Sequence, residues 1–410
     1  MTLILWRLSK WACCARISLT SKGTLRIVSP ALKHLVFPAL SKSGYLRYAA
    51  GDGPAVVTYH GVFPAGYEIR NLALDGNLVR ADALRRQLDL LKQRYHVITP
   101  EEFLHWSELQ WSEEESGDGK TSQEKRFVKK LSLPPRSILL TCDDALRNTL
   151  TEMVPILRDF GLSCLFFATG ASTEPTPSML WYEELYLMLL DAAAPIALNL
   201  PEANISIDIP PTERQKHATW WNLIERLSQF SAQQRHDFLD RIRQQLRLSE
   251  NWKLQFVEDT ALSSRFLALD RSGLQQLAAS GMTIGAHTVS HPILAHASDD
   301  LAWQEISESK TDLEKALGLP VWAFGYPFGN AATVTRRDLE LAERAGFRCA
   351  FMNTGGGFGA TNFRFAIPRV HVTAEMSLSE FEANISGFYR SLRQRFSKKH
   401  NEEELVRSNP

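Results

Sequence analysis

The chain has 410 residues, of which 44% are hydrophobic and 22% are charged, the proportions of an ordinary soluble globular protein. Its length allows one large core, or a core with a substantial insertion. Lysine plus arginine equals aspartate plus glutamate, 46 against 46, and this balance argues against a nucleic-acid partner.

Residues 1–50 form a basic extension ahead of the first predicted strand. Residues 1–40 mix tryptophan, leucine and isoleucine with scattered arginine and lysine, and no acidic residue occurs before Asp52. Two interpretations stay open: an amphipathic segment in peripheral contact with an anionic membrane, and an extension packed on the domain. Arg7 interrupts the first apolar run before signal-peptide length, and no stretch approaches the roughly 18 apolar residues of a membrane span. These features favour a cytoplasmic or inner-membrane-associated protein.

The five cysteines form no CxxC pair, and their number is odd. A disulfide scaffold is therefore not expected, and we interpret them as free thiols, buried where they lie in apolar runs. They are Cys13, Cys14, Cys142, Cys164 and Cys349.

Strands and helices alternate through the first part of the domain. Strands are predicted over residues 55–60, 97–98, 137–142 and 164–168, and helices over 81–95 and 150–160. The polar stretch 111–126 is expected to be a solvated loop. Strand, helix and strand in this rhythm indicate parallel βαβ units.

The rhythm changes over residues 173–266, which we interpret as a mainly helical insertion. Helices are predicted over 180–191 and 219–248, with a proline-rich break at 209–211. The alternation then resumes, with helices over 271–280, 302–317 and 335–345, and strands over 282–287, 321–326, 349–352 and 364–372. Residues 391–410 form a charged tail.

Asp143 and Asp144 directly follow the apolar strand over residues 137–142. Two adjacent acids are more often a solvated surface pair, but here they lie where a parallel barrel or sheet presents its active site. Because side chains alternate along a strand, both can face one site only if the chain curls away at Asp143. Carboxylates at such a rim need a cation or hydrogen-bond donors beside them.

His287 and His291 follow the predicted strand over residues 282–287, and Pro292 keeps His291 out of helical geometry. A lone histidine is more often structural. Two imidazoles and one carboxylate, however, are a standard ligand set for zinc or a similar divalent ion. Together with Asp144, the pair predicts a metal site.

Two further segments lie at predicted strand ends. FGYPFG, residues 324–329, is either a tight Pro-Gly turn or the source of a backbone N–H for a developing oxyanion. In the last strand Arg369 and His371 share one face. For His371 alone, a core histidine is the favoured interpretation.

These segments, taken in order, resemble the motifs of NodB-homology polysaccharide deacetylases, carbohydrate esterases that remove N- or O-acetyl groups from sugars. The segments are TCDDA at 141–145, HTVSH at 287–291, FGYPFG and PRVHV at 368–372. TYHGV at 58–62 resembles the branch that acts on poly-N-acetylglucosamine and related exopolysaccharides. The resemblance covers about residues 53–175 and 262–390. It implies an α/β fold, a distorted (β/α) barrel of about seven strands over residues 51–390, interrupted by the helical insertion.

The resemblance also implies a metal site and a catalytic base. Asp144, His287 and His291 would bind a divalent ion, with Zn²⁺ expected and Co²⁺, Ni²⁺ or Mn²⁺ as alternatives. Asp143 would be the general base that takes a proton from the metal-bound water.

Two further roles follow from the same resemblance. The N–H of Phe328 would share the oxyanion with the metal. A histidine would protonate the leaving group, and the candidates are His60 and His371.

The sequence departs from the family pattern at several positions. Cys142 replaces the usual phenylalanine before the acids, and Ala145 replaces a glycine, which strains the chain if that position needs a positive φ. Gly325 stands where many members carry an arginine that pairs with the base, and Arg369 is its candidate substitute. The tryptophan-bearing motif that orients the acid in many members has no match.

The leading hypothesis is therefore deacetylation of an N-acetylated sugar in a polysaccharide, glycolipid or lipid-linked precursor. One alternative is hydrolysis of a small cyclic amide at the same site, and another is a degenerate carbohydrate-binding module without catalysis. The complete set of ligands and base argues against the module. The insertion favours an extended substrate, because aromatic rings can stack on sugars. Its tryptophans are Trp181, Trp220, Trp221 and Trp252.

Overall fold

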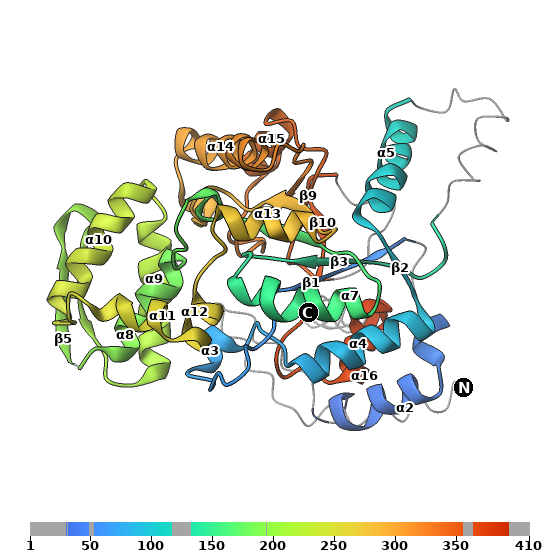
Figure 1. Ribbon diagram of the computed structural model, residues 1–410, viewed down its shortest axis with the longest axis horizontal. Helices are drawn as coiled ribbons and strands as arrows, with labels where there is room; N and C mark the ends of the chain where they lie inside the picture. The colour runs from blue at the N-terminus through green and yellow to red at the C-terminus, as the bar shows by residue number, and fades with distance from the viewer. Residues whose placement is uncertain are drawn as a thin grey trace, which may run out of the picture.

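The computed structural model describes residues 30, 32–48, 53–116, 133–193, 195–355 and 364–392. These residues form a parallel barrel with its covering helices and, beside it, a lobe of helices on the left in Figure 1. The lobe is formed by the segment predicted as a helical insertion. The chain enters the lobe after the barrel strand that ends at Ala168 and returns to the barrel at the strand that begins at Thr283.

The centre of the fold is a parallel sheet that closes on itself. Its strands, in spatial order, are β10 (Ile367–Pro368), β9 (Cys349–Met352), β8 (Ala323–Gly325), β7 (Thr283–Ala286), β4 (Leu165–Ala168), β3 (Ser137–Cys142), β1 (Ala55–Tyr59) and β11 (Val370–His371). Arg369 alone separates β10 from β11, so the two form one segment that pairs with β9 on one side and β1 on the other. Counted with that segment as one, the ring has seven members, which confirms the predicted distorted barrel. The short strand β2 (His96–Ile98) pairs with the first half of β3, outside the ring order.

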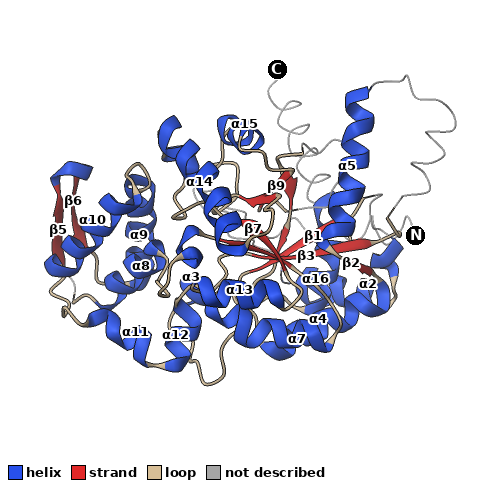
Figure 2. Cartoon of the chain, turned by 45° about the horizontal axis from the view of Figure 1, so that its top comes forward, coloured by secondary structure: helices blue, strands red, loops and turns tan. Residues whose placement is uncertain are grey.

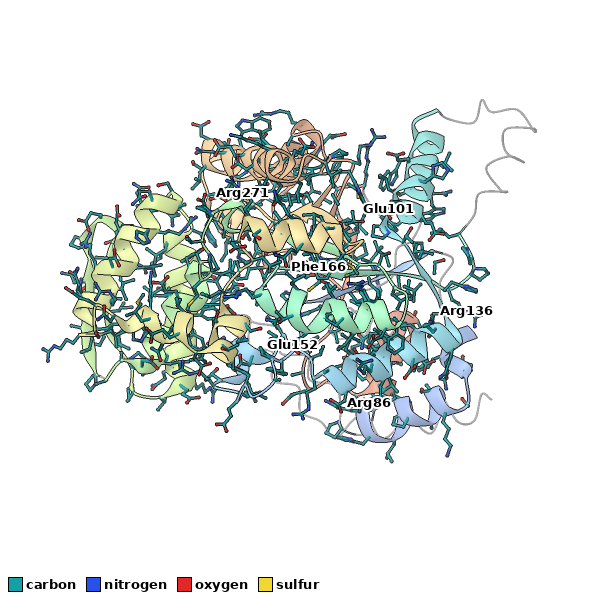
Figure 3. The ribbon with its side chains drawn as sticks, viewed as in Figure 1. Arg86, Glu101, Arg136, Glu152, Phe166 and Arg271 are labelled. Carbon is teal, nitrogen blue, oxygen red and sulfur yellow. The ribbon has the colours of Figure 1, made fainter. Side chains whose placement is uncertain are left out.

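The barrel strands are apolar on both faces, as parallel strands buried on both sides must be. Alternate residues point inward, where side chains such as Val56, Leu139 and Phe167 fill the barrel. Their neighbours Val57 and Phe166 point outward and pack under the helices. Figure 3 shows Phe166 inside the molecule, with Arg86 and Glu101 at its surface.

Helices cover the outside of the barrel. They are α4 (Ala81–Arg94), α5 (Pro100–Ser116), α7 (Val154–Asp159), α13 (Arg271–Ala279), α14 (Asp299–Leu317), α15 (Arg336–Arg344) and α16 (Leu378–Ile385). The predicted loop over residues 111–126 is wrong for 111–116, which continue α5. Glutamate is a good helix former, and Trp111 anchors the helix by packing against the barrel core. Residues 117–126 lie outside the described residues.

The lobe has a hydrophobic core of its own. Its elements are α8 (Trp181–Asp191), β5 (Ile196–Leu200), β6 (Ile205–Ile209), α9 (Glu213–Leu227), α10 (Ala232–Gln245), α11 (Gln255–Glu258) and α12 (Thr260–Phe266). The single helix predicted over residues 219–248 is wrong, because Ser231 caps a new helix through a capping box with Gln234. The β5–β6 hairpin was not predicted, and it lies at the outer edge of the lobe (Figure 2).

Part of the amino-terminal extension packs on the domain. Within it, η2 (Leu32–Val36), α2 (Phe37–Lys42) and η3 (Tyr45–Tyr48) are described, and buried Phe37 and Leu46 contact Ala383 of α16. The membrane-contact interpretation concerns residues 1–40, and of these residues 1–29 and 31 lie outside the described residues. Among the helices that are described, none combines the length and apolar character that crossing a membrane requires. Cys142, Cys164 and Cys349 are free and buried, as predicted.

Candidate active site

The chain turns sharply where β3 ends. The N–H of Asp143 donates to the carbonyl of Tyr59 at 2.9 Å, which continues the pairing of β3 with β1. Asp144, with φ 71°, and Ala145, with φ 48°, then adopt left-handed conformations that cost about 1–2 kcal/mol each. This is the curl that the sequence required for both carboxylates to face one site. The strain expected at Ala145 is confirmed.

A second turn follows β7. Its first residue, His287, donates its backbone N–H to Ala168 of β4 at 2.9 Å. Thr288 and His291 have φ values of 63° and 57°, so the turn is not helical, as Pro292 predicted. The hydroxyl of Thr288 accepts the N–H of His291 at 2.9 Å and closes the turn. Strained residues held in this way by surrounding hydrogen bonds are typical of functional sites.

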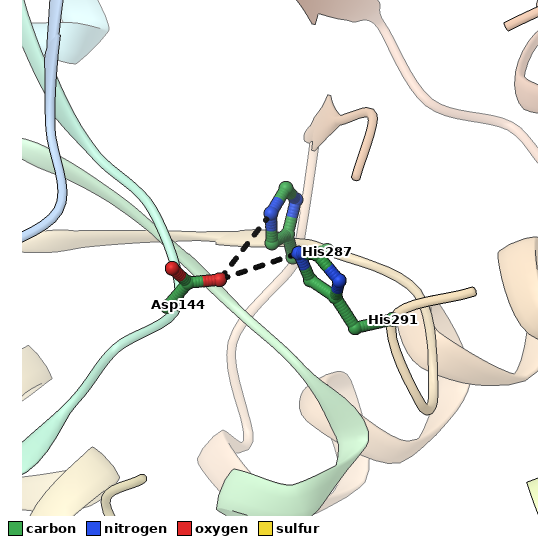
Figure 4. Close-up of side chains that lie close together, drawn as sticks. All are labelled: Asp144, His287 and His291. Carbon is green, nitrogen blue, oxygen red and sulfur yellow. Dashed lines mark ion pairs between the residues drawn. The ribbon is translucent and has the colours of Figure 1, made fainter. Parts of the chain in front are cut away.

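The two turns bring Asp144, His287 and His291 together (Figure 4). Their nitrogen and oxygen atoms lie within 4.8 Å of one another, and all three residues are buried. From Oδ1 of Asp144, Nε2 of His291 is 3.4 Å away and Nε2 of His287 is 3.7 Å away. Nδ1 of His287 donates to the carbonyl of Gly325 at 2.6 Å, so its Nε2 lone pair faces Asp144.

The electrostatics keep these groups in the forms that bind a cation. Burial lowers the pKa of His287 to about 4, so its imidazole is neutral at physiological pH. Burial alone would raise the pKa of Asp144, but the close approach of His291, followed by His60 and His287, outweighs it and lowers the pKa to about 2. Oδ1 of Asp144 is buried and has no hydrogen-bond partner among the described residues.

Asp143 forms a bidentate ion pair with Arg369. Nη1 and Nη2 of the arginine lie 2.6 and 2.7 Å from the two carboxylate oxygens, and both side chains are fully buried. Burial alone would raise the pKa of Asp143, but the charge of Arg369, followed by His287 and His60, holds it well below its usual range. Arg369 is thus the arginine partner that Gly325 does not supply.

The segment FGYPFG contains the last two residues of β8 and the tight turn that follows, and its first glycine faces His287. A Cβ on Gly325 would lie 2.9 Å from the ring of Phe167 and 3.2 Å from Nδ1 of His287, so a side chain does not fit there. Phe328 follows with φ 58°. Among the described residues, no acceptor takes the N–H of Phe328. The N–H of Phe328 is therefore able to donate a hydrogen bond to a bound ligand.

His60 and His371 lie side by side next to the aspartate pair. Their ring centroids are 4.7 Å apart, and Nε2 of His60 is 3.8 Å from Oδ2 of Asp143. His60 follows β1 and His371 ends β11, so the pairing of these two strands positions both rings. His371 is only half-buried, so its interpretation as a core histidine is wrong. Both candidate acids lie at the site.

Sequence reasoning missed Tyr182 and considered Trp181 only as a residue for sugar stacking, yet both residues contact His291. Nε1 of Trp181 donates to the carbonyl of His291 at 3.1 Å. The hydroxyl of Tyr182 lies 3.5 Å from Oδ2 of Asp144, and its ring centroid is 4.6 Å from that of His291. The signal was an aromatic pair at the start of a helix, which at the sequence level is equally typical of core packing.

A third residue of the lobe, Arg235, supports the turn over residues 287–291 through Glu305. Arg235 of α10 pairs with Glu305 of α14 at 3.3 Å, and both are buried. The other oxygen of Glu305 accepts the N–H of Ser290 at 2.8 Å, inside the histidine turn. The insertion therefore stabilises the conformation of the turn that carries His287 and His291. No sequence pattern around Arg235 predicted this contact.

One family model matches this chain. The model described as polysaccharide deacetylase matches residues 215–350, the region that holds His287, His291 and FGYPFG. The chain contains a polysaccharide deacetylase domain.

The match confirms a hydrolase of the polysaccharide deacetylase type. Asp143 and Asp144 lie outside the matched residues, and the structure brings Asp144 to the matched histidines. The match begins inside the segment predicted as an insertion, at residue 215. No curated protein matches the chain significantly.

Solved deacetylase structures are similar to this chain at low sequence identity. IcaB from Ammonifex degensii is 16% identical, with 82% of this chain and 98% of that one covered and a TM-score of 0.48. The Streptococcus pyogenes deacetylase PplD, in complex with acetate, is 16% identical over 81% of this chain and 98% of its own, with a TM-score of 0.47. BC0361, a polysaccharide deacetylase from Bacillus cereus, is 14% identical over 81% and 69%, with a TM-score of 0.46.

Proposed function

We propose that this polysaccharide deacetylase removes acetyl groups, N-acetyl in the first instance, from sugars of a glycan, glycolipid or lipid-linked precursor, by metal-dependent hydrolysis. The observation that carries the proposal is the convergence of Asp144, His287 and His291 beside the ion-paired Asp143. A buried carboxylate and two buried imidazoles serve no evident purpose as a core cluster. They are the donor set of a catalytic metal centre.

The donors fit a divalent cation on three counts. The set has three protein ligands, which leaves a further coordination position for water or substrate, as in catalytic zinc sites. One ligand atom, Oδ1 of Asp144, is buried without a hydrogen-bond partner among the described residues. The carbonyl of Gly325 fixes His287 in the tautomer whose Nε2 binds metal. Zn²⁺ is the expected ion, with Co²⁺, Ni²⁺ or Mn²⁺ as alternatives.

When bound, such an ion supplies Lewis acidity, which polarises the acetyl carbonyl and lowers the pKa of water to near neutrality. Asp143 then accepts the proton that the attacking water loses. Arg369 keeps this carboxylate ionised at every working pH, at the expense of basicity, because the same pairing lowers its pKa. A weakly basic carboxylate is sufficient when a metal ion lowers the pKa of the attacking water.

The nitrogen that leaves the acetyl carbon must gain a proton, and His60 is the proposed donor. Its Nε2 lies 3.8 Å from Asp143, so donor and base flank the same reacting centre. His371, with its ring centroid 4.7 Å from that of His60, is the alternative donor. The N–H of Phe328 has no acceptor among the described residues, and we assign it to the oxyanion.

The alternatives from the sequence are weaker. A carbohydrate-binding module without catalysis has no use for a buried base ion-paired beside a cation site. A small cyclic amide would need an enclosed pocket, whereas half-buried aromatic rings lead from this site toward the outside of the lobe. An acetylated glycan fits that opening better.

The test is acetate release from N-acetylglucosamine oligomers, measured with wild type and with Asp143→Asn. Wild type should release acetate and lose activity on treatment with a chelator. Asp143→Asn should lose at least about 100-fold in kcat, since general-base catalysis contributes about that much or more, and should still bind metal. Turnover by Asp143→Asn at the wild-type rate would refute the base assignment.

A further inference from the structure

A row of aromatic side chains leads from the metal site out along the lobe. It starts at His291, whose ring centroid is 4.9 Å from that of Phe328. Phe328 is 5.5 Å from both Tyr182 of α8 and Trp221 of α9, in each case edge to face. These three aromatic residues are half-buried, so their rings are partly open to solvent.

The row continues along α9 to a surface hollow. His217 lies one helical turn before Trp221, about 6 Å along the axis, so both side chains project from the same face of α9. Buried Trp220 lies behind them, with ring centroids 5.2 Å from His217, 6.0 Å from Trp221 and 4.9 Å from Tyr186. His217 and Tyr186 line the hollow.

The hollow has a volume of about 480 Å³, within the range of small-molecule sites. It lies between the loop with the short helix α3 (Leu72–Asp75) and the helices α8 and α9. Ile69 and Leu72, 48% and 58% exposed, offer it apolar surface. The remaining lining residues are Arg70, Asn71, Ala73, Glu213 and Arg214.

This chemistry suits an uncharged polyhydroxyl ligand. Arg70 pairs with Asp191, and the amide of Asn71 donates to one oxygen of Glu213. The guanidinium of Arg214 and the second oxygen of Glu213 therefore supply the donors and acceptors that match sugar hydroxyls, and the charges of both signs select for no single ionic group. The exposed ring of His217 and the aliphatic surface of Ile69 and Leu72 match the apolar faces of sugar rings, while buried Tyr186 lies behind them. A chain of ring contacts through Phe328, Trp221 and buried Trp220 connects the metal site with His217, so the hollow is well placed to bind the next part of the same substrate.

We infer that this hollow is a distal sugar-binding subsite for the glycan whose acetyl group lies at the metal site, and that the enzyme prefers oligosaccharides long enough to reach it. The inference rests on the proposed deacetylase function. It assigns Tyr182, Phe328 and Trp221 to the wall of the proximal subsite, and His217, Tyr186 and Leu72 to the distal one.

The test compares kcat/KM for acetate release from the dimer and the pentamer of N-acetylglucosamine. Wild type should prefer the pentamer. His217→Ala should reduce the pentamer-to-dimer ratio roughly three- to tenfold, the range expected for one lost ring contact. The matched control is His236→Ala, which removes an exposed histidine of α10 in the same lobe and should keep the wild-type ratio.

A direct binding measurement separates this inference from the proposed function. Pentamer binding to Asp143→Asn and to Asp143→Asn/His217→Ala is measured by calorimetry, and the second protein should bind more weakly. Failure of every oligomer to yield acetate, together with intact pentamer binding that depends on His217, would refute the deacetylase proposal and leave the subsite standing. Equal kcat/KM values for dimer and pentamer in wild type, or an unchanged ratio in His217→Ala, would overturn the subsite.

Discussion

The pairing of Asp143 with Arg369 gives the sharpest test of how the site is built. In the variant Arg369→Met, both guanidinium donors are lost while the carboxylate stays fully buried. Removing one partner of a buried ion pair costs about 3–5 kcal/mol, because the remaining charge is neither solvated nor paired. We therefore expect the free energy of unfolding to fall by about that amount.

The assay is urea-induced unfolding of the chelator-treated protein at neutral pH. The matched control is the double variant Asp143→Asn/Arg369→Met, in which no charge is left unpaired. It should recover most of the lost stability, because replacing a whole buried pair is often nearly neutral. A loss below about 1 kcal/mol in Arg369→Met, or a double variant as unstable as the single one, would refute the reasoning.

Three further predictions concern individual residues. Ala145→Gly should raise the free energy of unfolding by about 1 kcal/mol in urea titrations, because glycine adopts φ 48° without strain; a loss of stability would contradict the strained turn. Because the pKa of His287 falls to about 4 in the folded metal-free protein, the unfolded chain binds the extra proton below pH ~6.5. Stability of that protein should therefore drop as the pH falls from ~6.5 toward ~4, and His287→Gln should flatten this dependence; parallel curves would rule it out. His60→Asn should lose activity on N-acetyl sugars yet keep most activity on an aryl acetate, whose leaving group needs no proton, and equal losses on both substrates would remove His60 as the acid.

The barrel could be predicted because its strands are short apolar runs bounded by turn residues. Each run, such as residues 137–142, is buried on both faces, so the pattern is plain without tertiary information. The convergence of Asp144, His287 and His291 was predictable for a related reason. They directly follow two of these strands, and parallel strands of one barrel present their carboxyl ends on the same side.

What could not be predicted depends on contacts between segments far apart in the sequence. Tyr182 and Trp181 reach the site only because the lobe folds back on the histidine turn, and nothing local distinguishes them from core aromatics. Trp220 and Trp252, considered as sugar-stacking residues, are buried, and of the four tryptophans only Trp221 is partly open. Arg369 was a candidate partner of the base because the family resemblance implies an arginine there and Gly325 does not supply it. The bidentate geometry of its ion pair could not be predicted, because it depends on the closure of the barrel, which brings the segment with Arg369 close to the end of β3.

The measurement that tests the central claim most directly is the metal content of purified protein, determined by elemental analysis alongside acetate release from the same sample. Wild type should carry about one divalent ion per chain and should lose both the ion and acetate release on chelation. His291→Ala should be folded, bind little metal and release no acetate. Equal metal content in wild type and His291→Ala, or full acetate release by metal-free wild type, would contradict the metal-dependent site.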